Sequence, residues 1–519
     1  MHPLATLDHR HLWHPFTQMR DWLENEPIVI VEGHGALLRD ARGREYLDAN
    51  SSIWTNLHGH NHPRLNAALR RQLNRIAHSS ALGFGNEPAS LLAARLVQAA
   101  NPTAAVTGGS RCRVPEARMP GRGASQNPDL RKVFFSDDGS TAMEVALKLA
   151  YEFARRSGRG QEPRYLTLEG AYHGDTVGAV SLGHIDLFHR AYSGLLFKSD
   201  KVMAPYCYRC PFNGAKPERA DAREYRKCNW ECVSKLERKF ESRKKRGDRY
   251  AAFVFEPLMQ GAAGMIPQPA GWLGRAAEIA RGHGALLIAD EVMTGFGRTG
   301  VGASPASTPS SHPGGSLWPT HASHLTQATQ LPGFAPPLLF ACHHEGVQPD
   351  FMALAKGLTG GYLPMAATLT TQAIFDAFLG EYHEFKTFFH GHSFTGNQLG
   401  AAAALASLEL LQTKASVRAR RRLEQTMRDE LKALWKHPHI GDIRQAGLIV
   451  GIELVRDWRT RAPFDLRERA GIRVCEGLAK RGVLTRPIGN VVVIMPPYCT
   501  TPEQARRMVA ALGEAVKGL

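Results

Sequence analysis

The sequence predicts an α/β protein built around a mostly parallel sheet. Short apolar runs at residues 165–168, 252–255 and 286–289 are typical of buried parallel strands. These runs alternate with longer helical patterns up to about residue 300, and such alternation indicates a parallel sheet covered by helices. A chain of 519 residues is too long for one small core, so we expect two or more packed units.

Taken in order, the segments predict a large domain flanked by the two parts of a smaller one. Residues 1–63 are irregular, with short strand-like runs, and we assign them to the small domain. Residues 64–394 carry the strand–helix pattern of the large domain. Residues 395–519 begin with a long helix rich in Ala and Leu and continue with strand-like runs and a terminal helix. This last pattern is typical of a small α+β domain.

Two stretches interrupt the pattern of the large domain. Residues about 101–129 are rich in Gly, Pro, Ala and Arg, and residues about 302–337 are dominated by Ser, Pro, Thr, His and Gly. We expect both to be surface insertions and the second to be mobile. The second must loop outward if Asp290 and Lys356, which lie on either side of it, share one site.

Two side chains at the edge of the predicted sheet indicate covalent chemistry with an aldehyde. Lys356 lies between an apolar run and a Gly-rich turn, where an ammonium is costly to bury and its pKa is easily lowered. Asp290 ends another apolar run, at the sheet edge where open α/β folds bind ligands. A lysine for a Schiff base and a carboxylate for a pyridinium nitrogen are what pyridoxal phosphate requires.

A third motif could hold the phosphate of that cofactor. Residues 134–150 run from an apolar strand through a small polar turn into an amphipathic helix. The amides around Gly139 and Ser140 would point out of the helix N-terminus, which is an anion site. An ordinary helix cap would also explain this turn, but its place before Asp290 and Lys356 favours the phosphate.

These motifs together resemble the class III aminotransferases, which use pyridoxal phosphate. The class resemblance rests on residues 137–140, 171–174, 256–257, 290–300 and 356–357. Within the class the chain is similar to the aminotransferases of biotin biosynthesis, on residues 11–19, 51–54, 391–397 and 484–498. The resemblance covers about residues 9–510 apart from the two insertions. It implies a fold type I transferase whose large domain has a seven-stranded sheet, with a small domain formed by the N- and C-terminal segments.

The resemblance also implies roles for the residues of the site. Lys356 would bond the cofactor and move a proton, Asp290 would face its ring nitrogen, and Tyr172 would stack on its ring. Gly139 and Ser140 would hold the phosphate. In a homodimer the neighbouring subunit would add His392 and Ser393 to the same site. Glu256 matches a family position near the cofactor, but its role does not follow from the sequence.

For the substrate, the sharpest prediction is Arg486. An arginine in an apolar neighbourhood is costly unless it pairs with an anion, and the resemblance implies that it binds the carboxylate of 8-amino-7-oxononanoate. An internal salt bridge is the alternative. Trp54 and Phe16 would line an apolar channel, with Tyr172, Lys356 and Gly391 also touching the substrate. Phe16 and Ile53 stand where some members carry Tyr and Trp, which leaves the amino donor open.

The resemblance implies transamination of 8-amino-7-oxononanoate to 7,8-diaminononanoate, with adenosylmethionine or lysine as donor. One alternative is another omega-aminotransferase, acting on ornithine, 4-aminobutyrate or a polyamine with a keto acid. The other is a catalytically silent protein on the same fold. Residues 13–15 and 52–54 with Arg486 favour the biotin pathway, and the joint presence of Lys356, Asp290 and residues 139–140 argues against a silent protein.

Four cysteines are clustered at Cys207, Cys210, Cys228 and Cys232. Their spacing is compatible with a structural Cys₄ zinc site that staples a loop at residues 205–235, although four unliganded thiols are the alternative. A catalytic metal is not expected, because four thiolates leave no open position.

The composition excludes several other functions. The net charge is +16, but the excess is interspersed with acidic residues, so we expect no nucleic-acid binding. No apolar run approaches the ~20 residues of a membrane span, and charged residues at positions 8–11 stand where an export signal would need an apolar run. We therefore expect a cytoplasmic protein.

Overall fold

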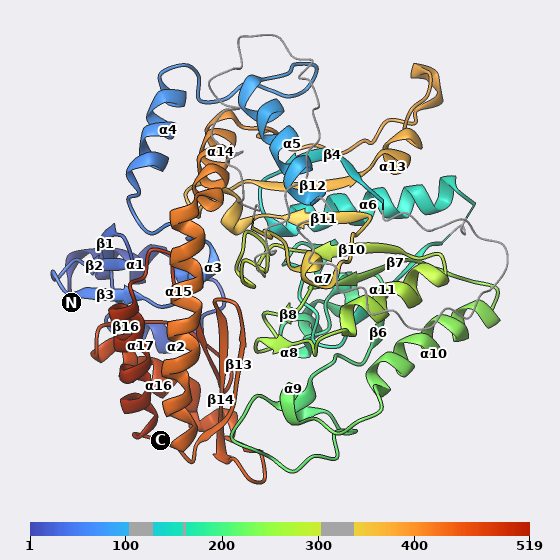
Figure 1. Ribbon diagram of the computed structural model, residues 1–519. Coiled ribbons are helices and arrows are strands. Elements are labelled where there is room, and N and C mark those ends of the chain that lie inside the picture. The colour runs from blue at the N-terminus through green and yellow to red at the C-terminus, as the bar shows by residue number, and fades with distance from the viewer. Residues whose placement is uncertain (103–127, 159–161, 303–336) are drawn as a thin grey trace, which may run out of the picture.

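The computed structural model describes residues 1–102, 128–158, 162–302 and 337–519 (Figure 1). The two predicted insertions lie almost entirely outside these ranges. In the described part of the chain, no helix combines the length and the apolar character needed to cross a bilayer.

The large domain is built on a seven-stranded sheet with the strand order β4-β12-β11-β10-β7-β5-β6. All neighbouring pairs from β6 to β11 are parallel, whereas β12 runs antiparallel to both β11 and β4. This confirms the predicted mostly parallel sheet. The strands are β4 (Leu130–Ser136), β5 (Arg164–Leu168), β6 (Asp200–Val202), β7 (Tyr250–Phe255), β10 (Leu286–Asp290), β11 (Phe351–Leu354) and β12 (Ala366–Thr371).

Helices cover this sheet because each offers it an apolar face. In α6 (Gly139–Arg156), Ala142, Val145, Ala146 and Leu149 are buried at the helical spacing seen in the sequence, and the helix packs on β11 and β12. Other helices of this domain are α4 (Pro63–Leu73), α5 (Glu87–Ala100), α7 (Val177–Leu182), α8 (Asp186–His189), α10 (Glu231–Lys245), α11 (Trp272–Gly282) and α13 (Gln372–Asp376). The long helix α14 (Gln398–Gln412) packs against α4 and α5.

The two ends of the chain meet in the smaller sheets. The N-terminal strands β1 (Ile30–His34), β2 (Leu37–Asp40) and β3 (Glu45–Asp48) are joined by β16 (Val483–Leu484), which pairs in parallel with β3. A five-stranded sheet contains β13 (Ile440–Ala446), β14 (Ile449–Asp457), β15 (Ala462–Pro463), β17 (Pro487–Ile488) and β18 (Val491–Ile494). Its surroundings include α15 (Lys414–Leu431), α16 (Ala470–Lys480) and α17 (Pro502–Val516), at the lower left of Figure 1. The N-terminal helices are α1 (Pro3–His11) and α2 (Met19–Glu24).

A left-handed turn, α3 (Ser51–Trp54), follows β3. Its four residues all have positive φ, between 46° and 65°. None is glycine, and each L-residue in this conformation costs about 1–2 kcal/mol. The turn therefore stores roughly 4–8 kcal/mol, which its surroundings must offset.

A loop of the large domain at residues 205–228 is bound to the small domain by arginines, and we call it the arginine-tied loop. Arg219 donates to the carbonyls of His437 and Ile440, and Arg223 donates to the carbonyl of Gln445 at 2.8 Å. In the other direction, Arg461 donates to the carbonyl of Tyr208 at 2.9 Å. The loop includes α9 (Ala222–Tyr225).

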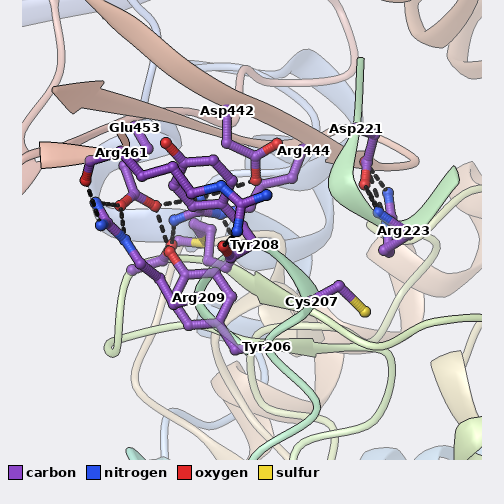
Figure 2. Close-up of polar contacts among 12 residues, drawn as sticks. Tyr206, Cys207, Tyr208, Arg209, Asp221, Arg223, Asp442, Arg444, Glu453 and Arg461 are labelled. Carbon is purple, nitrogen blue, oxygen red and sulfur yellow. Dashed lines mark hydrogen bonds and ion pairs between the residues drawn. The ribbon is translucent and has the colours of Figure 1, made fainter. Parts of the chain in front are cut away.

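A buried ionic cluster lies beneath this loop (Figure 2). Arg444 of β13 contacts Glu453 at 2.6 Å and Asp442 at 3.2 Å, and Arg209 contacts Glu453 at 2.6 Å. Tyr206 also donates its hydroxyl to Glu453. Burial raises the pKa of Asp442 to about 7, whereas at Glu453 burial is outweighed by Arg444 and Arg209, which lower the pKa. The cluster couples the arginine-tied loop to the core of the small sheet.

Candidate active site

The predicted sheet-edge residues meet around one cavity of about 360 Å³. This volume lies within the range of small-molecule sites. The wall is formed by the ends of β10 and β11, the start of α6, the left-handed turn and the 172–174 segment. Its polar and aromatic members include Trp54, Asp137, Asp138, Gly139, Ser140, Tyr172, His173, Glu256, Asp290, Lys356 and Tyr362.

Lys356 follows β11 at the start of a 3₁₀ turn (Lys356–Thr359), with φ at 45°. Its ammonium nitrogen lies 4.8 Å from the centre of the Trp54 ring. Burial lowers the pKa of Lys356, and Arg298 acts in the same direction, while Asp290 and Glu256 oppose the shift. A lowered pKa gives more of the neutral amine, which is the nucleophilic form.

Asp290 ends the fully buried strand β10 and is itself only 6% exposed. Its carboxylate pairs with Nδ1 of His173 at 2.8 Å and accepts the amide of Val292 at 3.0 Å. These partners fix the carboxylate in one orientation while it still borders the cavity. It can therefore hold a proton on a ring nitrogen placed there.

The start of α6 forms a cradle that only small groups can approach. Asp138 caps the helix by accepting the amide of Thr141 at 2.9 Å, while Gly139 and Ser140 border the cavity. A Cβ on Gly174 would lie 2.1 Å from Oγ of Ser140, and one on Gly139 would lie 2.7 Å from a methyl group of Val292. The two glycines thus let residue 174 and Val292 pack directly against the start of α6, whose first residues border the cavity; a helix N-terminus in this position suits a phosphate.

Tyr172 and Glu256 are also part of the cavity wall. The Tyr172 hydroxyl donates to Asp175 at 2.7 Å, and burial raises the pKa of this phenol. Glu256 accepts the amide of Gly261 at 2.7 Å and that of Tyr172 at 3.3 Å. Burial raises the pKa of Glu256 to about 7. Glu256 therefore ties the backbone at Tyr172 to the backbone at Gly261.

Phe16 and Arg486 lie beside one another, outside this wall. Phe16 packs edge-on to Tyr172, with ring centres 6.5 Å apart, and its carbonyl accepts Nη2 of Arg486 at 3.3 Å. Arg486 is exposed in the single chain, and its binding of a substrate carboxylate stays a prediction. Arg486 stands between β16 and β17, and its sequence neighbours Thr485 and Pro487 are only partly buried.

The segment at residues 391–393 also lies outside the cavity wall of the single chain. His392 forms an ion pair with Asp137 at 3.0 Å, which places it next to the start of α6. Gly391 and Ser393 are exposed, and the Ser393 carbonyl accepts a hydrogen bond from Nε2 of His78 at 2.9 Å.

The structure does not form the predicted zinc site. The four cysteines line one small cavity of about 10 Å³, yet in the described ranges no group of three or more His, Cys, Asp or Glu side chains is placed to hold a metal ion. A guanidinium takes part in the cluster instead, since Arg226 lines the same cavity and donates to Cys228 at 3.3 Å. Burial raises the pKa of Cys207 to about 12, so this thiol stays protonated.

His173, which lies within the motif at residues 171–174, has no role that the sequence alone predicts. Because His173 is only 3% exposed and its Nε2 has no hydrogen-bond partner in the described residues, its one anchor is Asp290. A histidine directly after the ring-stacking position was the available signal.

Comparison with known proteins agrees with this geometry. The profile of the family described as aminotransferase class-III matches residues 19–304 and 338–516. Adenosylmethionine-8-amino-7-oxononanoate aminotransferases from Geobacter sulfurreducens and Aquifex aeolicus are 44% and 39% identical, each over 99% of this chain and 97% of its own length. The solved structure of the Methanocaldococcus jannaschii protein of that name is 35% identical, with a TM-score of 0.80 over 99% of this chain and 98% of its own. An amine transaminase from an uncultivated Pseudomonas species is 29% identical, with a TM-score of 0.78 over 98% of each chain.

Proposed function

The chain belongs to the class-III aminotransferases, which are pyridoxal-phosphate-dependent transaminases, and on this premise we propose that it aminates 8-amino-7-oxononanoate in biotin biosynthesis. The observation that carries the chemistry is the convergence of Lys356, Asp290 and the α6 cradle on one cavity. The substrate follows from relatives that match almost the whole chain at up to 44% identity.

The cavity fits pyridoxal phosphate. When bound, this cofactor supplies an aldehyde for amines and a ring that accepts electrons. We assign its phosphate to the amides of Gly139 and Ser140, which border the cavity at the N-terminus of α6. Asp290, oriented by His173, would hold a proton on the ring nitrogen, and Tyr172 would cover the ring.

Lys356 has two tasks in this proposal. Its amine would bond the cofactor in the resting enzyme, and the lowered pKa of Lys356 favours the neutral form that this bond needs. Once a substrate amine takes its place, the Lys356 amine would be free to accept a proton from the substrate carbon and to donate it again, while the bound cofactor would supply the electron-accepting ring. The Trp54 ring beside Lys356 shields this transfer from water.

The acceptor would extend from the cavity toward Phe16 and Arg486. Trp54 and Tyr172 offer apolar faces for an alkyl chain, and Phe16 continues that surface. Arg486, exposed and held beside Phe16, is open to the substrate carboxylate. An assay with a panel of amino donors distinguishes adenosylmethionine from lysine as the donor.

We also propose a homodimer whose partner subunit completes each site with residues 391–393. The support is a set of large apolar side chains that a lone chain leaves exposed near this segment. They are Leu82, Phe84, Phe389 and Phe394, exposed by 60–89%. Sedimentation should give twice the mass of one chain.

The function is tested by an assay of the purified protein with 8-amino-7-oxononanoate and a panel of amino donors. We expect 7,8-diaminononanoate from adenosylmethionine or lysine, and no product from Lys356→Ala. Turnover of ornithine or 4-aminobutyrate with a keto acid, and none of the oxononanoate, would overturn the assignment in favour of another omega-aminotransferase.

A further inference from the structure

Asp48 is a buried carboxylate that belongs to no part of the cavity wall, yet it contacts the segment that carries Trp54. It ends β3 and is 3% exposed. One of its oxygens accepts the amides of Asn50 and Ser52, at 3.2 and 3.1 Å. The other accepts the Ser52 hydroxyl at 2.9 Å and pairs with His60 at 3.0 Å.

These contacts fall on the left-handed turn itself. Ser52 is its second residue, with φ at 48°, and two of its polar atoms bind Asp48. Four consecutive L-residues do not keep positive φ without outside support. Further side-chain bonds on the turn come from neutral hydroxyls: Ser51 donates to the carbonyl of Met495 at 2.7 Å, and Thr55 donates to the carbonyls of Ser51 and Ser52 at 3.3 and 3.0 Å. Asp48 is therefore the charged anchor of this conformation.

The last residue of the turn is Trp54, whose φ of 65° sets the direction of its side chain. Its ring lies against Lys356 and also against Gly261, where an added Cβ would come within 3.4 Å of the indole. If the turn relaxed to right-handed φ values, the indole would leave this position. The position of the Trp54 ring beside the Lys356 amine thus depends on the left-handed backbone that Asp48 stabilises.

We infer that Asp48 is a positioning residue of the amino-transfer reaction, which acts by holding Trp54 over the Lys356 amine. The inference rests on the proposed function, because it concerns the same amine. Asp48 does not border the cavity, so it acts on Trp54 only through the left-handed turn.

The chain offers a closely matched control in Asp40. This carboxylate is 6% exposed and also accepts two backbone amides on one oxygen, those of Arg42 and Arg44, and a hydroxyl on the other, that of Tyr46. It lies in the same small sheet but holds a turn that is not part of the cavity wall. Asp40→Asn therefore removes an equivalent buried charge without touching Trp54.

The first measurement uses the protein without cofactor and needs no activity. Labelling of Lys356 by an acylating ester is followed by peptide mass spectrometry in the wild type, Asp48→Asn and Asp40→Asn. We expect about tenfold faster labelling in Asp48→Asn, because the indole no longer covers the amine, and a wild-type rate in Asp40→Asn. Ser52→Ala removes one of the four contacts and should give a smaller increase, which keeps the test decisive if Asp48→Asn does not fold.

The second measurement is a double-mutant cycle on kcat/KM. We expect Asp48→Asn to lower kcat/KM by about tenfold or more in the wild type and by less than about twofold in a Trp54→Ala background. A structural role would give the same loss in both backgrounds. Equal losses, or labelling of Lys356 at the wild-type rate in Asp48→Asn and Ser52→Ala, would overturn the inference. A wild type that labels as expected but transfers no amino group would instead refute the proposed function.

Discussion

Replacing Gly174 with alanine should displace the cradle that we assign to the cofactor phosphate. The added Cβ would lie 2.1 Å from Oγ, 2.5 Å from Cβ and 2.7 Å from Cα of Ser140. The hydroxyl alone could rotate away, but the Cα belongs to the backbone of α6. Relief therefore requires the first turn of α6 to move by about 1 Å to restore van der Waals contact.

The magnitude follows from two costs. Gly174 has φ at 122°, and an alanine there carries strain of about 1–3 kcal/mol. Overpacking against Ser140 adds about 1–3 kcal/mol. Because a shift of about 1 Å at a binding group can cost as much as ~100-fold, we expect cofactor affinity to fall by roughly 10- to 100-fold.

The assay is an absorbance titration of the cofactor-free protein with pyridoxal 5′-phosphate, together with its thermal unfolding. Gly43→Ala is the control, because Gly43 has φ at 82° but an added Cβ would meet nothing within 4 Å. It should lose about 1–2 kcal/mol through φ alone and keep its affinity. If Gly174→Ala bound the cofactor as tightly as Gly43→Ala, the cradle would be wrongly placed.

Three further outcomes are expected. Arg444→Met leaves Asp442 buried without its cation and leaves Glu453 with Arg209 alone, so the free energy of unfolding in urea should fall by about 3–5 kcal/mol. Adding Glu453→Gln should recover part of this loss. Burial lowers the pKa of His58 to about 3, so below pH 6.5 the unfolded chain binds a proton that the folded chain does not. The free energy of unfolding therefore falls by up to about 5 kcal/mol as the pH drops from 6.5 towards 3. His58→Gln should lose less stability than the wild type between pH 7 and 4.5 in thermal unfolding. Asp290→Asn should bind cofactor yet lower kcat by at least about 100-fold in steady-state assays, because the ring nitrogen loses its counter-charge.

Each of these has a contrary result. A loss below about 1 kcal/mol in Arg444→Met would mean that water reaches the cluster in Figure 2. Parallel pH curves for wild type and His58→Gln would show that His58 is free to protonate when folded. Full activity in Asp290→Asn would remove this carboxylate from the proposed chemistry.

The strands and the cavity-lining pair Asp290 and Lys356 were predictable because their signals are local. An apolar run fixes the strand, and the residue at its end reaches the sheet edge whatever the rest of the chain does. The His173–Asp290 pair joins positions 117 residues apart, so no local pattern contains it. Nothing in Ser-Ser-Ile-Trp predicts positive φ, since glycine and asparagine are absent from the turn and its anchors include Asp48 and the distant carbonyl of Met495.

The exposure of Arg486 could not be predicted either. The residue stands between the short strands β16 and β17, and the apolar residues of the run do not determine whether one side chain between two strands reaches solvent. For the cysteines, spacing alone did not predict that Arg226 would join them.

The arginine-tied loop bears on how reactants come and go. Arginines of the loop donate hydrogen bonds to the small-domain carbonyls of His437, Ile440 and Gln445. In return, an arginine of the small domain donates to the loop carbonyl of Tyr208. A hinge motion that separated the large and the small domain would break these hydrogen bonds and expose the buried ionic cluster to water. We therefore expect substrates and products to enter and leave through an opening of constant backbone shape, and side chains such as Phe16 to change rotamer as they pass.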